Sequence, residues 1–234
     1  MNIKSHIPNA ITCLNLLAGM IGIYLVIQGK IQWAAYVVLL AALFDFLDGL
    51  VARLLSAHSE IGKQLDSLAD MVTFGVLPSF MVFMMLKEIS TSSYTPYIAF
   101  LIGTQSALRL AKFNVDTRQS ERFIGLPTPA NALFFCTLPQ LMQAVPWTKP
   151  ILLNPVVFMV ITLLFAFLLT AEIPLIALKF KNFSLMQNIY RYLVMVLGLI
   201  SVLIVGIGGI PFVILLYILF SLLENWLTPG EFTG

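Results

Sequence analysis

Residues 45–70 read DFLDGLVARLLSAHSEIGKQLDSLAD, and this stretch decides how the surrounding chain folds. Apolar sequence flanks it on both sides, AAYVVLLAAL at 34–43 and MVTFGVLPSFMVFMML at 71–86. A helix crosses the apolar core of a bilayer with roughly 20 residues. The pattern therefore predicts two membrane helices at about 32–56 and 62–86, joined by the polar turn SAHSE. Because the turn is short, the two helices must pack side by side and antiparallel.

The rest of the chain is as apolar as these two segments. Hydrophobic residues make up 59% of 234 positions and charged residues only 10%, whereas charged residues reach about 25% in soluble globular domains. The predicted fold class is all-α, a polytopic membrane helical bundle in a single domain over residues 1–234. About eight transmembrane helices are expected at 8–28, 32–56, 62–86, 95–115, 128–146, 152–178, 188–206 and 210–227.

Basic residues are unevenly divided between the two sides of this predicted bundle. One side carries Lys4, Arg53, Lys63, Arg109, Lys112, Arg118, Arg122, Lys179, Lys181 and Arg191. The other side carries Lys30, Lys87 and Lys149. Cytoplasmic loops are enriched in Lys and Arg, so both termini and the 45–70 turn are predicted at the cytoplasmic side of an inner or cytoplasmic membrane. The net charge of +2, with scattered bases, indicates no nucleic-acid partner.

Four aspartates lie on two helical stripes in the quoted stretch. Asp45 and Asp48 are three residues apart, and Asp66 and Asp70 are four apart, so antiparallel packing can bring the stripes face to face. Each charge costs roughly 2.5–3.5 kcal/mol at a helix centre in the membrane, so the cluster needs counter-charge. All-oxygen ligands favour two divalent cations, Mg²⁺ or Mn²⁺. Such a metal pair clamps phosphoryl groups during in-line displacement.

Ion pairing or cation transport could also account for the aspartates. The carboxylates could form buried ion pairs with Arg53, Lys63 or Arg109, although the acids outnumber the bases close to them. A divalent-cation transporter is an alternative of another class, because acidic residues in membrane helices also mark cation pathways. Transport favours acids distributed over several helices, whereas here they lie in one helix pair.

The spacing D-x2-D-G-x2-A-R-x8-G-x3-D-x3-D, from Asp45 to Asp70, resembles the CDP-alcohol phosphotransferase family without a departure. The resemblance implies transfer of a phosphatidyl or related group from a CDP-linked donor to an alcohol, with release of CMP. Residues 32–86 would form the catalytic helices, with Asp66 and Asp70 as catalytic residues and Asp70 as the general base. The implied metal ligands are Asp45, Asp48, Asp66 and Asp70, and the implied CDP or phosphate contacts are Gly49, Ala52, Arg53 and Gly62.

Other stretches resemble the phosphatidylserine synthase branch: IPNAITCLNLLAG at 7–19, LRLAKFNV at 108–115 and FIGLPTPANA at 123–132. That branch implies CDP-diacylglycerol as donor, L-serine as acceptor, and a homodimer. Thr12 and Asn15 are expected to hydrogen-bond to cytosine or ribose, or alternatively to a neighbouring helix. The carboxylate of serine needs a cationic partner in the acceptor site. The candidates for the acceptor site, within about residues 105–132, are Arg109, Lys112, Asn114, Arg118 and Arg122.

Two residues depart from what the branch usually carries. Lys112 stands where arginine is expected, and Asn131 stands where a small alanine is usual. These departures concern the acceptor and leave the transfer chemistry untouched. A sister enzyme that uses glycerol phosphate, inositol or choline is therefore an alternative, because it would share every metal ligand.

Overall fold

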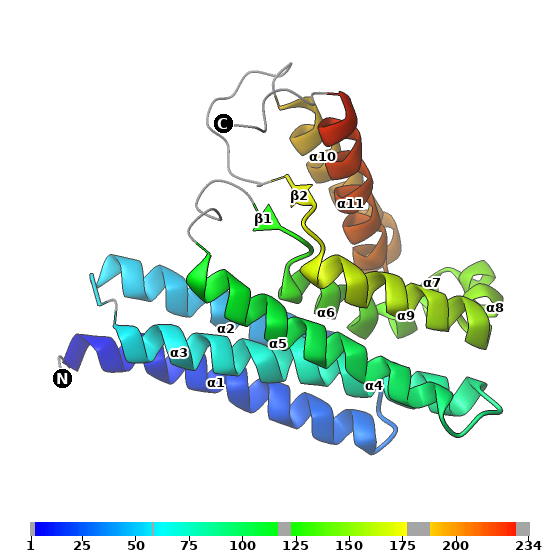
Figure 1. Ribbon diagram of the computed structural model, residues 1–234, viewed down its shortest axis with the longest axis horizontal. Helices are drawn as coiled ribbons and strands as arrows, with labels where there is room; N and C mark the ends of the chain where they lie inside the picture. The colour runs from blue at the N-terminus through cyan, green and yellow to red at the C-terminus, as the bar shows by residue number, and fades with distance from the viewer. Residues whose placement is uncertain (1–2, 58, 117–122, 177–187, 228–234) are drawn as a thin grey trace.

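The structure, a computed structural model, describes residues 3–57, 59–116, 123–176 and 188–227 (Figure 1). The first half consists of α1 (Ile3–Ile27), α2 (Trp33–Leu54), α3 (Glu60–Asp70), the π-helix η1 (Met71–Val76), α4 (Leu77–Ile89), the 3₁₀-helix η2 (Thr95–Ala99) and α5 (Phe100–Val115). The second half consists of β1 (Phe123–Ile124), α6 (Thr128–Cys136), α7 (Leu138–Ala144), the 3₁₀-helix η4 (Pro146–Thr148), α8 (Lys149–Leu152), α9 (Pro155–Thr170), β2 (Pro174–Leu175), α10 (Ile189–Val205), the 3₁₀-helix η5 (Gly206–Gly209) and α11 (Ile210–Leu227).

Helices occupy each of the eight predicted apolar segments, which confirms an all-α protein of the membrane type. Within the described residues, four helical stretches are long and apolar enough to cross a membrane: His6–Ile27, Trp33–Leu54, Glu60–Ile89 and Ile189–Leu227. A fifth arises if Pro146–Leu152 and Pro155–Thr170, bent by 84°, act as one span. The number of eight spans stays a prediction.

The last of these stretches, Ile189–Leu227, folds back on itself. Gly206 has a φ of 65°, which ends α10, and the Ser201 hydroxyl donates to the Gly209 carbonyl oxygen at 3.0 Å. One turn away, a Cβ on Gly198 would lie 3.2 Å from a Val213 methyl group. α10 and α11 therefore form an antiparallel hairpin, which in Figure 1 rises above α9 at a steep angle to the long helices α1 to α5.

Aromatic side chains fill the interior between α6 and α9. Phe134 stacks on Phe165 with ring centroids 3.9 Å apart, and Phe135 meets the same ring edge-on at 5.4 Å. The outer faces are also apolar, since Leu203 and Ile204 on α10 are 74% and 77% exposed. Large exposed apolar side chains of this kind are favourable in the hydrocarbon core of a membrane, where they contact lipid tails instead of water.

A short two-stranded ribbon corrects the prediction of helix throughout residues 152–178. β1 and β2 pair antiparallel, with Phe123 opposite Leu175 and Ile124 opposite Pro174. α9 ends at Thr170 because Ala171 takes an extended backbone conformation, and Pro174 offers no N–H for a helical hydrogen bond. The helix prediction was therefore wrong for residues 171–176.

The third predicted helix, at 62–86, contains a π-helical segment directly after Asp70. Pro78 lacks the N–H that would satisfy the Phe74 carbonyl in an α-helix, while the Ser79 hydroxyl donates to the Gly75 carbonyl at 2.7 Å. η1 is held on two sides, because the Thr73 hydroxyl donates to the Asn15 carbonyl of α1 at 3.1 Å. On the other side, a Cβ on Gly75 would lie 3.0 Å from the Ser106 Cβ of α5. The helix that carries Asp66 and Asp70 is thus fixed between α1 and α5.

The close approach of α1 to η1 depends on Gly19. A methyl group at this position would overlap the Thr73 side-chain oxygen and lie 2.9 Å from the Thr73 Cα. Gly19→Val is therefore expected to lower the free energy of unfolding by about 1–3 kcal/mol, the usual range for overpacking. Denaturant titration of the purified protein in detergent measures this change. Ala10→Val, at an exposed position of the same helix, should change stability little; equal stability of the two variants would contradict the packing argument.

Candidate active site

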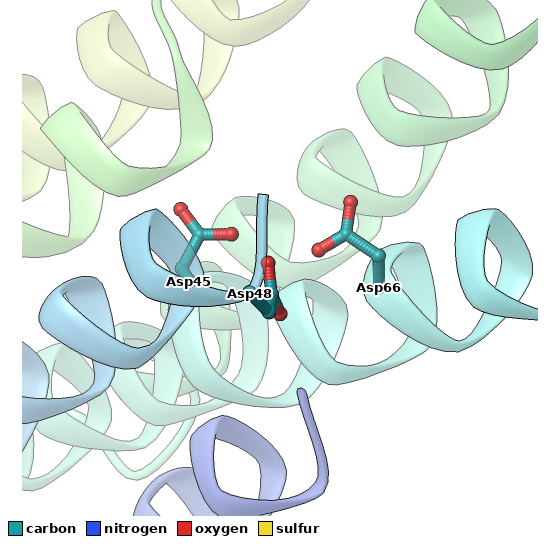
Figure 2. Close-up of side chains that lie close together, drawn as sticks. All are labelled: Asp45, Asp48 and Asp66. Carbon is teal, nitrogen blue, oxygen red and sulfur yellow. The ribbon is translucent and has the colours of Figure 1, made fainter. Parts of the chain in front are cut away.

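Carboxylates from two antiparallel helices meet at one point of the bundle. Asp45 and Asp48 come from α2 and Asp66 from α3, and one oxygen of each lies within 4.8 Å of the other two. Figure 2 shows the Asp45 and Asp66 carboxylates turned toward each other, with Asp48 between them in this view. Asp70, one helical turn beyond Asp66, lies outside that group of three but interacts electrostatically with Asp45 and Asp66. The predicted meeting of the two stripes is confirmed for Asp45, Asp48 and Asp66.

The basic residues that could have neutralised this cluster are directed elsewhere. Arg53 donates through Nε to the Gly49 carbonyl of its own helix at 3.0 Å, and Lys63 donates to the Asn114 carbonyl at 3.1 Å. Among the described residues, no lysine or arginine forms an ion pair with any of the four aspartates. The ion-pair hypothesis for the cluster is therefore not supported, and within the described part of the chain no cationic side chain pairs with its negative charge.

The aspartate cluster has the properties of a divalent-metal site. All its ligand atoms are carboxylate oxygens, which magnesium and manganese prefer, and Asp48 is 6% exposed. Among the described residues, the buried Oδ1 of Asp66 has no hydrogen-bond partner, although buried polar atoms almost always have one. A bound cation would satisfy that oxygen and offset the mutual repulsion of the carboxylates. The residues present therefore fit a divalent metal.

A cavity of about 510 Å³ opens beside these carboxylates. Of the predicted CDP contacts, Thr12, Gly49, Ala52 and Gly62 line it. A Cβ on Gly49 would meet nothing within 4 Å, whereas one on Gly62 would lie 3.0 Å from the Asn9 and Ser59 side-chain oxygens. Gly49 thus leaves open space, and Gly62 lets α1 and the start of α3 approach.

The sequence interpretation missed several residues that line the same cavity. They are Pro8, Asn9, Ala57, Ser59, Glu60 and Lys63. Two signals could have indicated them. Pro8 lies one helical turn before Thr12, and Ser59 precedes α3 as an N-cap residue, its hydroxyl accepting the Gly62 N–H at 3.0 Å.

Comparison with known proteins agrees with this geometry. Residues 5–205 match the model of the CDP-alcohol phosphatidyltransferase family. The chain belongs to this family. The match spans both helices that carry the aspartates and every predicted acceptor residue, so the aspartate pattern lies within a family match that covers most of the chain.

Several curated relatives of this chain have named activities. A CDP-diacylglycerol–serine O-phosphatidyltransferase of Bacillus subtilis is 37% identical over 130 residues, which cover 53% of this chain and 70% of the relative. An archaetidylserine synthase of Methanothermobacter thermautotrophicus is 37% identical over 134 residues, 54% of each chain. A CDP-diacylglycerol–serine O-phosphatidyltransferase of Helicobacter pylori is 35% identical over 128 residues, 54% of each chain. The alignments thus span about half the length of two of these three relatives.

Helix α5 carries three of the predicted acceptor residues, Arg109, Lys112 and Asn114, and lies alongside the helix that bears Asp66 and Asp70. The Asn114 amide donates to the Ser67 hydroxyl at 2.8 Å, and Ser106 lies against Gly75 two turns earlier. α5 therefore runs antiparallel to α3 and η1, and Arg109 falls between those two contacts, at the level of the residues that follow Asp70. Arg109 and Lys112 line a small cavity of about 30 Å³ with Glu172. Arg118 and Arg122 lie outside the described residues.

Arg109 has a structural contact that the sequence did not predict. Its Nη1 donates to the Ile124 carbonyl at 2.8 Å and to the Leu169 carbonyl at 3.1 Å. The guanidinium thereby ties α5 to strand β1 and to the end of α9. Arg109 is buried, with 7% of its surface exposed, so this tie belongs to the interior of the protein.

Proposed function

We propose that this chain is a two-metal phosphatidylserine synthase that transfers the phosphatidyl group from CDP-diacylglycerol to L-serine and releases CMP in phospholipid biosynthesis. The observation that carries the proposal is the meeting of Asp45, Asp48 and Asp66 beside a 510 Å³ cavity. It occurs in a member of the family whose relatives carry serine O-phosphatidyltransferase names. Two cations, Mg²⁺ or Mn²⁺, would be held by these three aspartates together with Asp70.

The nucleotide half of the reaction is assigned to the large cavity. Bound metals supply positive charge to the diphosphate and stabilise CMP as it leaves. Gly49 and Ala52 leave room for the nucleotide. Arg53 is close to this cavity through its bond to Gly49, and we assign it to phosphate charge. The diacyl tails of the donor stay in the bilayer while its head group reaches the aspartates.

The acceptor half is assigned to the side where α5 meets α3. The serine oxygen forms a bond to the phosphatidyl phosphorus, the bond from that phosphorus to CMP breaks, and Asp70 accepts the hydroxyl proton. Arg109 and Lys112, with Asn114 and the more distant Arg118 and Arg122, are the candidates for binding the serine carboxylate. Arg109 can serve both roles, because a guanidinium has five N–H donors and Nη1 supplies the two contacts to backbone carbonyls.

The membrane arrangement belongs to the same proposal. We assign the whole chain to one domain with about eight spans, with the active site and both termini at the cytoplasmic side. The excess of Lys and Arg on that side supports this orientation. A homodimer is the proposed assembly, on the family resemblance alone.

Release of CMP from CDP-diacylglycerol by the purified protein tests the proposal. CMP release is expected to require Mg²⁺ or Mn²⁺, to stop with a chelator and to be stimulated by L-serine, because serine is the attacking alcohol. Stimulation by glycerol phosphate, inositol or choline instead of serine would favour the sister enzyme. Metal binding without any CMP release, with each of these alcohols supplied in turn, would favour a cation transporter, although the confinement of the acids to α2 and α3 argues against one.

A further inference from the structure

α1 contributes no carboxylate to the cluster, yet it contacts an aspartate on each of the two helices that do. Thr12 lies opposite Asp48 of α2, and Asn15 lies opposite Asp70 at the end of α3. Thr12 is 3% exposed and Asn15 is fully buried. Both side chains are therefore buried, and each has a carboxylate as a hydrogen-bond partner.

The hydrogen bond from Thr12 to Asp48 is shorter than the one from Asn15 to Asp70. Thr12 Oγ1 is 2.7 Å from Asp48 Oδ2 and 3.1 Å from the Pro8 carbonyl oxygen. A hydroxyl has one hydrogen to donate, and hydrogen bonds to ionised acceptors are shorter and stronger than neutral ones. The hydrogen is therefore assigned to Asp48, which fixes one carboxylate oxygen and leaves the other for a ligand.

Asn15 makes the corresponding contact on the other helix. Its Nδ2 donates to Asp70 Oδ1 at 3.2 Å. The backbone of α1 is locked at this level, since the Thr73 hydroxyl donates to the Asn15 carbonyl oxygen at 3.1 Å. The distance between Asn15 and the end of α3 is thus set by contacts that do not involve the carboxylates.

We propose that Thr12 and Asn15 are positioning residues, which hold Asp48 and Asp70 in the orientation that binds metal before the nucleotide arrives. The inference rests on the proposed metal centre. Of the two expectations for Thr12 and Asn15, it follows hydrogen bonding to a neighbouring helix rather than to cytosine or ribose. The physical reason is repulsion: carboxylates that face each other turn apart unless neutral donors hold them. Loss of a hydrogen bond to a residue that ligates a metal usually weakens metal affinity or activity by about 10–100-fold.

Mn²⁺ titration of the full-length protein in detergent, followed by the electron paramagnetic resonance signal of free Mn²⁺ without nucleotide, tests this. Thr12→Val removes the hydroxyl at constant shape and is expected to weaken Mn²⁺ affinity by about 10-fold or more. Thr12→Ser keeps the hydroxyl and should bind as the unchanged protein does. Asn15→Leu should weaken binding independently of Thr12.

Thr162→Val is the matched control, because Thr162 is also fully buried and donates at 2.8 Å to a carbonyl four residues earlier, but touches no carboxylate. Its Mn²⁺ affinity should be unchanged. Unchanged affinity in Thr12→Val, with a raised Michaelis constant for CDP-diacylglycerol, would overturn the inference and leave the proposed function standing. Absence of Mn²⁺ binding in the unchanged protein would overturn both. If Thr12→Val does not give the native melting curve, Thr12→Ala repeats the test with a smaller side chain that also lacks the hydroxyl.

Discussion

Asp66→Asn is expected to lower phosphatidyl transfer by more than about 100-fold. Loss of a hydrogen bond to a metal-ligating residue already lowers metal affinity or activity by roughly 10–100-fold. Asp66→Asn goes further, because it removes the charge of a ligand itself. Asparagine has the shape of aspartate, so the packing of α3 against α1 and α5 should survive. The buried Oδ1 of Asp66, which has no hydrogen-bond partner in the described part of the chain, is the atom whose replacement matters most. Serine-dependent CMP release, measured at matched amounts of inserted protein, gives the size of the effect.

Glu88→Gln is the control for Asp66→Asn. It also removes one carboxylate charge, but Glu88 is exposed near the end of α4, away from the cluster, and its transfer rate should stay within the error of the assay. Mn²⁺ binding separates chemistry from folding, because Asp66→Asn should lose affinity while its melting temperature without metal is kept. Full transfer activity in Asp66→Asn would remove the basis for the metal assignment.

The aspartate cluster could be predicted because short-range geometry determines it. Asp45 and Asp48 are fixed on one face by helical periodicity, and so are Asp66 and Asp70. The five-residue turn then leaves antiparallel packing as the only arrangement of the two helices. Within such a pair, the sequence distance between ligands determines their spatial distance closely enough to predict the site.

The contacts of α1 could be predicted only as a pair of alternatives. Thr12 and Asn15 lie on one stripe, but their partners are 36 and 55 residues away in the sequence. The rotation of α1 about its axis, relative to α2 and α3, decides whether Thr12 and Asn15 face a nucleotide or a neighbouring helix. That rotation depends on Gly19 and Thr73, whose close approach has no periodic signal in the sequence.

The ribbon of β1 and β2 could not be predicted for a related reason. Four residues of ordinary composition form it, and their pairing joins positions about 50 residues apart. The groups that hold it are backbone carbonyls, whose partners the amino-acid types of the ribbon do not reveal. The Tyr217 hydroxyl of α11 donates to the Ile176 carbonyl at 3.1 Å, and Asn225 donates to the Pro174 carbonyl at 2.6 Å. The α10–α11 hairpin, which carries no candidate catalytic residue, therefore supports the segment that Arg109 also holds.

Arg109→Ala is expected to lower the free energy of unfolding by about 2–6 kcal/mol. The substitution leaves the Ile124 and Leu169 carbonyls without the Nη1 donor, and each buried unsatisfied group costs roughly 1–3 kcal/mol. Gly125 makes repair difficult, because its φ of 75° and the closeness of the Leu169 and Ala171 carbonyls restrict how the chain can shift. Denaturant titration in detergent, followed by tryptophan fluorescence, measures the loss.

Lys112→Ala is the matched control, since it removes a positive charge one turn along the same helix from an exposed side chain. Surface substitutions of this kind usually stay within about 0.5 kcal/mol, so only Arg109→Ala should unfold early. Equal stability of the two variants would refute the structural role of Arg109. Arg109→Lys then isolates the acceptor role, because an ammonium is a point charge that cannot reproduce the planar fork of a guanidinium. A Michaelis constant raised more for serine than for CDP-diacylglycerol in Arg109→Lys would place the serine carboxylate on this guanidinium, whereas equal increases would leave Arg109 only the task of joining α5 to the ribbon.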